Sequence, residues 1–109
     1  MYIARMQLTA QFGHLDACLE ILRKWERDVG KRSGWRLSST RLVTGQLGAS
    51  QGDIEFEVRV DSLTDLESAW ADLDKNPNHK AYMGELTPHA SAPLRWSVYR
   101  VVELFGVDD

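Results

Sequence analysis

The stretch of sequence that decides the fold is DIEFEVRVDSLTDLESAWADL, residues 53–73. Between residues 54 and 60, apolar and charged side chains alternate, which is the period of a strand with one buried face. Ser62 stands three residues before Asp65, a spacing close to that of a capping box at a helix N-terminus. Apolar residues then recur at helical spacing. They are Leu63, Leu66, Ala69, Trp70 and Leu73. The stretch therefore predicts a half-buried strand that turns directly into an amphipathic helix.

The segments before this stretch supply two strands and a helix. Residues 2–10 alternate between apolar and polar side chains, which predicts a strand. A long apolar stripe over residues 15–29 predicts an amphipathic helix, with Gly30 as its left-handed stop. A less regular strand is expected over residues 35–44, and the glycine-rich residues 45–52 favour a long hairpin connection to the central strand.

The segments after the stretch complete the fold. Pro77 disfavours a helical conformation at Asn76, so the helix is expected to end near Asp74. A second short helix is expected over residues 78–86, followed by an irregular loop. Residues 94–104 are rich in β-branched and aromatic side chains and predict a closing strand.

The resulting β-α-β-β-α-β order is that of a ferredoxin-like α+β fold. It predicts a four-stranded antiparallel sheet with its helices on one face. Right-handed crossovers give the strand order 4-1-3-2, with strands numbered along the chain. The length of 109 residues suits one domain, which we place at residues 1–105 with a C-terminal tail at 106–109.

Composition and charge narrow the class of protein. The net charge of −3 gives no general attraction to nucleic acid or anionic lipid. The single cysteine, Cys18, cannot form an internal disulfide, which favours a reducing compartment. The N-terminus lacks the apolar run of a signal peptide, and no apolar run approaches the roughly 20 residues that span a bilayer. We therefore expect a cytoplasmic protein without a membrane partner.

The second face of the predicted central strand carries charge. Its residues Glu55, Glu57 and Arg59 face either solvent or a partner sheet that pairs with them. Further candidates for this face are Arg5, Gln7 and Arg41. RNA-recognition domains of the same topology present aromatic and basic side chains there, so the two glutamates argue against nucleic acid binding.

Two segments resemble a known family. They are VDSLTDLESAWADLDKNPNHKAYM (residues 60–83) and RWSVYRVVE (residues 95–103). The sequence resembles the NIPSNAP-like members of the dimeric α+β barrel superfamily, which also includes the antibiotic-biosynthesis monooxygenases. The resemblance rests on the Ser-Leu start of the helix, Trp70, Asn76-Pro77 with Tyr82 following, and the closing strand. It implies a homodimer whose two sheets form a barrel, and a pocket between each sheet and its own helices. It does not imply one particular reaction.

Five side chains around the interrupted helix are candidates for such a pocket. They are Trp70, His79, Tyr82, His89 and Trp96. In the functional interpretation, His79 acts as an acid or base and Tyr82 donates a hydrogen bond to a small molecule. In the alternative interpretation, Trp70 and Tyr82 belong to the core and both histidines are exposed loop residues.

No metal or cofactor site is predicted. The histidines His14, His79 and His89 lie in separate segments without the short spacing that metal ligands usually show, and Cys18 lies on an apolar helical stripe. Haem monooxygenases of the resembled superfamily share an asparagine on the first strand, where this chain has Gln7. Neither haem nor flavin is supported by a motif.

Two hypotheses follow for function. The first is a homodimeric small-molecule-binding protein or monooxygenase-like enzyme with a pocket between sheet and helices. The second is a non-catalytic binding or interaction module of the same fold. A cavity of several hundred Å³ reached by His79 or Tyr82 would support the first. A filled core, with both side chains in solvent, would support the second.

Overall fold

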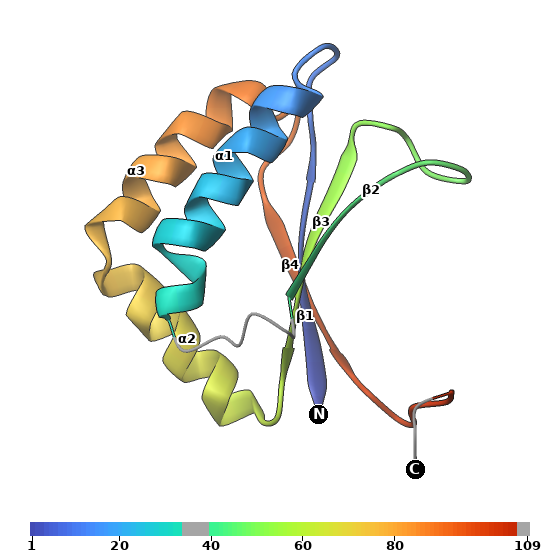
Figure 1. Cartoon of the computed structure of the whole chain (residues 1–109), viewed down its shortest axis with the longest axis vertical. Helices are drawn as coiled ribbons and strands as arrows, with labels where there is room; N and C mark the ends of the chain where they lie inside the picture. The colour runs from blue at the N-terminus through green and yellow to red at the C-terminus, as the bar shows by residue number, and fades with distance from the viewer. Residues whose placement is uncertain (34–39, 107–109) are drawn as a thin grey trace.

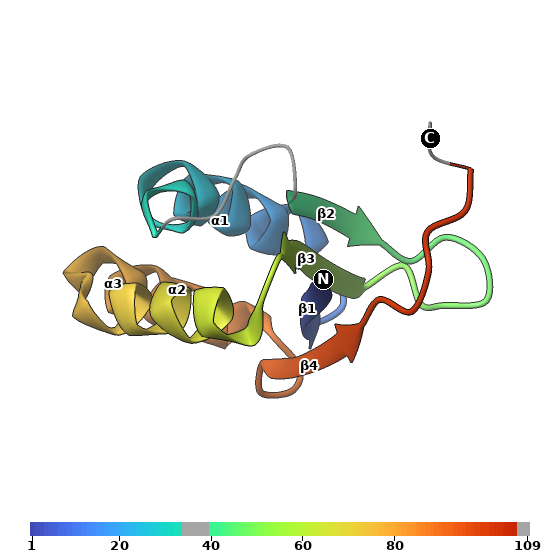
Figure 2. The ribbon, with the colours of Figure 1, turned by 90° about the horizontal axis from the view of Figure 1, so that it is seen from below.

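The computed structural model describes residues 1–33 and 40–106, which form a four-stranded antiparallel sheet with the helices on one face (Figures 1 and 2). The strand order is β2-β3-β1-β4, which confirms the predicted order and the ferredoxin-like α+β class. The elements in chain order are β1 (Tyr2–Thr9), α1 (Leu15–Asp28), η1 (Gly30–Arg32), β2 (Thr40–Thr44), β3 (Asp53–Val60), α2 (Leu63–Lys75), α3 (Pro77–Leu86), η3 (Thr87–His89) and β4 (Arg95–Arg100).

The predicted half-buried strand is β3, which lies between β2 and β1. Its alternate side chains are buried beneath the helices, as the alternation of the sequence indicates. These side chains are Ile54, Phe56, Val58 and Val60. In β1, Ala4, Met6 and Leu8 are buried on the same side. The core therefore fills the space between one face of the sheet and the helix layer.

Two local caps set the path of the chain through the helices. The Ser62 hydroxyl accepts a hydrogen bond of 3.1 Å from the backbone N–H of Asp65, so the predicted start of α2 is confirmed. The Asn76 side chain accepts a bond of 2.9 Å from the backbone N–H of Asn78. Asn76 is extended and Pro77 is the first residue of α3, which confirms the predicted break. The break lets α3 turn and run beside α1 (Figure 1).

Gly30 is not the left-handed stop that the sequence predicted. Helix α1 ends at Asp28, and Gly30 begins η1 without a positive φ. Its lack of a side chain matters for another reason. A Cβ atom at Gly30 would clash with Oε2 of Glu26 and would lie 2.9 Å from Cζ3 of Trp25. Close packing against α1, and not backbone conformation, therefore favours glycine here.

One predicted strand is shorter than expected, and part of another lies outside the described residues. Strand β2 covers residues 40–44, while residues 35–39 of the prediction lie outside the described part of the chain. Strand β4 ends at Arg100, and Val101 adds one last hydrogen bond to the carbonyl of Met1. Since β1 begins at Tyr2, residues 102–106 have no neighbouring strand to pair with in the described part of the chain.

Within residues 1–33 and 40–106, no helix is long and apolar enough to cross a bilayer.

Candidate functional site

A pocket of about 430 Å³ lies between the sheet and the helices, at the junction of α2 and α3. Aromatic and aliphatic side chains make up most of its wall. The lining residues are Met6, Trp25, Trp70, Leu73, Asp74, His79, Met83, Leu94 and Trp96. They come from β1, α1, α2, α3, β4 and the residue just before β4, so the pocket depends on the assembled fold. Its size and lining are typical of a site for a small organic molecule.

His79 is held in one orientation by the buried Trp25. The indole Nε1 of Trp25 donates a hydrogen bond of 3.0 Å to Nδ1 of His79. Because indole N–H is only a donor, Nδ1 must be an acceptor, and in the neutral ring the proton sits on Nε2. Burial lowers the pKa of His79, and the negative charge of Asp74 opposes this shift in part. His79 is therefore a neutral hydrogen-bond donor through Nε2.

Trp70 and Trp96 form the aromatic wall of the pocket. Their rings pack edge to face, with centroids 5.6 Å apart and an interplanar angle of 67°. The indole Nε1 of Trp70 is buried, and the described residues offer it no hydrogen-bond partner. A buried donor without a partner costs about 1–3 kcal/mol. An acceptor atom of a bound molecule would remove that cost.

Two of the five sequence-predicted pocket residues lie elsewhere. The hydroxyl of Tyr82 donates to the carboxylate of Asp28 across the contact between α1 and α3, and this hydrogen bond raises the pKa of Tyr82. His89 lies beside His14, with their Nδ1 atoms 2.9 Å apart. Met83 lies four residues after His79 in α3, and both side chains face the pocket. Helical spacing from His79 is the signal that could have identified Met83.

Sequence reasoning also missed Trp25 as a partner of His79. The two residues are 54 positions apart, and Trp25 belongs to the apolar stripe of α1. The stripe correctly predicted that Trp25 is buried. It did not predict that the indole N–H of Trp25 would donate a hydrogen bond to a histidine.

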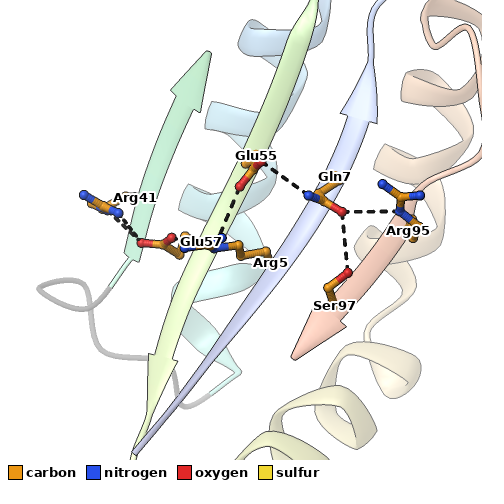
Figure 3. A network of polar contacts seen from close by, with 7 residues as sticks. All are labelled: Arg5, Gln7, Arg41, Glu55, Glu57, Arg95 and Ser97. Atoms are coloured by element: carbon orange, nitrogen blue, oxygen red, sulfur yellow. Dashed lines mark hydrogen bonds and ion pairs between the residues drawn. The ribbon is translucent and has the colours of Figure 1, made fainter. Parts of the chain in front are cut away.

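The opposite face of the sheet carries a network of polar contacts (Figure 3). Glu57 is its centre, because its side chain accepts from Arg5 Nε at 3.0 Å and from Arg41 Nε at 2.8 Å. These partners flank it on β1 and β2, in direct register. The two ion pairs hold the Glu57 side chain at 12% exposure.

The network continues toward β4 through Gln7. Its amide nitrogen donates to Glu55 at 3.3 Å, and its amide oxygen accepts from Arg95 at 3.3 Å and from Ser97 at 3.5 Å (Figure 3). The structure thus joins five of the six residues predicted for this face. Arg59 is exposed, and its side chain is not part of this network among the described residues. A hollow of about 630 Å³ lies on the same face and includes Gln7, Glu55 and Arg95 in its lining.

Comparisons with known proteins give the fold class. The sequence matches no protein-family model and has no significant match among curated proteins. A NIPSNAP family protein from Agrobacterium tumefaciens superposes with a TM-score of 0.78 at 10% identity, over 98% of each chain. SnoaB, a cofactor-independent oxygenase from Streptomyces nogalater, superposes with a TM-score of 0.72 at 8% identity, over 97% of each chain.

A second A. tumefaciens NIPSNAP family protein, of unknown function, gives a TM-score of 0.74 at 14% identity, over 91% of this chain and 86% of the other. Identities this low establish similarity of fold alone. The chain therefore has the fold that NIPSNAP and antibiotic-biosynthesis-monooxygenase proteins share, as the sequence resemblance implied.

Proposed function

We propose that this protein binds a flat aromatic molecule that carries an acceptor oxygen, in the pocket between the sheet and α2–α3. The observation that carries the proposal is the buried N–H of Trp70, which lines an aromatic pocket and has no partner among the described residues. A carbonyl or phenolate oxygen is the group that satisfies such a donor.

The rest of the pocket supports the same ligand chemistry. His79 offers a second N–H, since Trp25 keeps its Nδ1 as the acceptor. The edge-to-face rings of Trp70 and Trp96 suit contact with a planar aromatic surface. A pocket of about 430 Å³ accommodates a molecule of two or three fused rings.

A matched pair of ligands tests this proposal. Fluorenone and fluorene have the same planar ring system, but only fluorenone carries a carbonyl oxygen. We expect fluorenone to bind more tightly by about tenfold, the value of one hydrogen bond to a buried donor. Quenching of tryptophan fluorescence gives both dissociation constants.

The variant Trp70→Phe supplies the control, because it keeps an aromatic ring and removes the N–H. The preference for fluorenone should largely disappear in this variant, whatever happens to the affinity for fluorene. Equal affinities in the wild-type chain, or an unchanged preference in Trp70→Phe, would refute the assigned role of Trp70.

A monooxygenase-like activity is the second candidate. Two observations favour it: the fold shared with the oxygenase SnoaB, and the carboxylate of Asp74 in the pocket lining, which could accept a proton from a bound phenol. His79 does not serve as that base, because its Nε2 already carries the proton. Oxygen consumption with anthrone as substrate would test this. Uptake above the spontaneous rate that is lost in Asp74→Asn supports an enzyme, and binding without uptake supports a binding module.

We also propose that two copies of the chain pair through their open sheet faces. Most of the charges on this face already have partners in their own chain, which lowers the cost of covering them. Apolar side chains are exposed beside the network, among them Val43 and Tyr99 on the strands and Phe105 after β4, the last at 84% exposure. Sedimentation equilibrium should give twice the chain mass of 12.4 kDa at micromolar concentration.

A further inference from the structure

The side chains of His14 and His89 meet at one end of the contact between α1 and α3. Their Nδ1 atoms lie 2.9 Å apart and their ring centroids 5.1 Å apart, although the residues are separated by 75 positions in the sequence. Neither side chain is fully buried, so the pair is accessible from solvent at its edge. The pair belongs neither to the aromatic pocket nor to the sheet-face network.

Main-chain contacts hold both histidines in place. The backbone N–H of His14 donates to the carbonyl of Gln11 at 2.9 Å, in a turn that Gly13 makes possible with a φ of +83°. The carbonyl of His89 accepts from the backbone N–H of Gln11 at 2.8 Å. Both residues are therefore anchored to Gln11 through the main chain, which keeps the two rings close together.

The spacing of the two nitrogens fits chelation of a metal ion. With metal–nitrogen bonds of about 2.0–2.1 Å, two imidazoles on one ion have their nitrogens roughly 2.9–3.4 Å apart, for angles between about 90° and 110° at the metal. The observed 2.9 Å lies at the short end of that range. The ring centroids are 5.1 Å apart, so the rings face each other almost head-on and must rotate to point at one ion. Without an ion, one ring must donate a proton to the other, which is the ordinary state of such a pair.

We propose that His14 and His89 together bind one divalent transition-metal ion through their Nδ1 atoms. Imidazole ligands select copper, nickel and zinc over magnesium and calcium. No third histidine, cysteine, aspartate or glutamate converges with them among the residues that the structure describes. Solvent therefore completes the coordination. The partial positive charge at the N-terminus of α1 opposes a cation, so the site binds less tightly than a four-ligand structural site.

Calorimetric titration of the tag-free chain tests the proposal. Ni²⁺ and Zn²⁺ should each bind at one ion per chain, and Mg²⁺ should give no saturable heat. The variants His14→Gln and His89→Gln should each weaken binding by at least tenfold, since loss of even an outer partner of a metal ligand commonly costs about 10–100-fold. The third histidine provides the matched control, because His79→Asn should leave the metal affinity unchanged.

A second measurement does not depend on how the variants fold. The electron paramagnetic resonance spectrum of the wild-type chain with one equivalent of Cu²⁺ should show coupling to two imidazole nitrogens. The proposal is overturned by the absence of one-to-one binding, by full affinity in both His14→Gln and His89→Gln, or by a copper spectrum without two coupled nitrogens.

Discussion

The indole Nε1 of Trp25 lies 3.0 Å from Nδ1 of His79 and donates a hydrogen bond to it. This bond ties the buried face of α1 to the first turn of α3, directly at the wall of the aromatic pocket. It also decides the chemistry of the pocket, because a histidine whose Nδ1 is the acceptor presents an N–H on its other nitrogen.

Removing the acceptor of this bond should destabilise the fold. We expect His79→Ala to lower the free energy of unfolding by about 1–3 kcal/mol, since a buried indole N–H loses a hydrogen bond. In His79→Asn, the amide oxygen falls close to the position of Nδ1 and should recover part of the loss. Urea denaturation gives the free energy of unfolding of both variants. Equal losses in the two variants would show that ring packing, and not the hydrogen bond, is what matters.

The stability contributed by His79 should depend on pH. Because burial lowers its pKa in the folded chain, the unfolded chain binds the proton more readily. This contribution is therefore complete above the ordinary histidine pKa of about 6.5 and is lost as the pH falls from there toward the folded value. Urea denaturation between pH 5 and pH 8 should show a steeper fall in acid for the wild-type chain than for His79→Asn. If the stability of both chains fell equally with pH, the lowered pKa of His79 would be contradicted.

The stability contributed by Glu26 should change with pH in the opposite direction. Burial raises its pKa from 4.5 to about 7, against the attraction of Lys31, and its carboxylate oxygens have no hydrogen-bond partner among the described residues. Its contribution is thus favourable below the unfolded pKa and is lost as the pH rises through about 7. We expect Glu26→Gln to raise stability by about 1–2 kcal/mol at pH 8 and to change little at pH 4.

The exposed Glu20 is a suitable control for this effect. It pairs with Arg23 and Lys24 on the outer face of α1, so Glu20→Gln should change stability by less than about 0.5 kcal/mol at either pH. A pH-independent effect of Glu26→Gln would show that the carboxyl group is not protonated in the folded state.

Two glycines should respond to alanine in opposite directions. Gly30→Ala places a Cβ atom against Trp25 and Glu26, and we expect a loss of about 1–3 kcal/mol. Gly84 lies exposed within α3 with no atom near its missing side chain, so Gly84→Ala should gain about 0.5–1 kcal/mol from helix propensity. Thermal unfolding, followed by circular dichroism, gives the change in stability of each alanine variant. A neutral Gly30→Ala would mean that the Glu26 side chain moves aside freely.

Reversal of the charge at Glu57 tests the sheet-face network and the proposed pairing together. Glu57→Lys would place three cations side by side, because the register sets Arg5 and Arg41 on either side of it. We expect a loss of about 1 kcal/mol in chain stability and a weaker dimer in sedimentation. The control Glu67→Lys makes the same change on the exposed face of α2 and should alter neither. An unchanged dimer constant in Glu57→Lys would argue against pairing through this face.

The sequence by itself determined the features that depend on near neighbours along the chain. The alternation over residues 54–60 fixed which face of β3 is buried, and Ser62 and Pro77 fixed where α2 starts and ends. These signals are local because strand pleating, helix capping and the proline ring act within a few residues. With the order of elements, they were enough to predict the fold class and the strand order.

Only the tertiary structure decided which side chains meet. Tyr82 was predicted for the pocket but contacts Asp28, while Trp25 and Met83 line it instead. His14 and His89 looked unrelated in the sequence, yet their rings are in contact. The reason is geometric, because small changes in the rotation of a helix about its axis, and in its position along its neighbour, select which of several adjacent side chains faces a given point. Those quantities are set by packing across the whole core, and no short segment of the sequence encodes them.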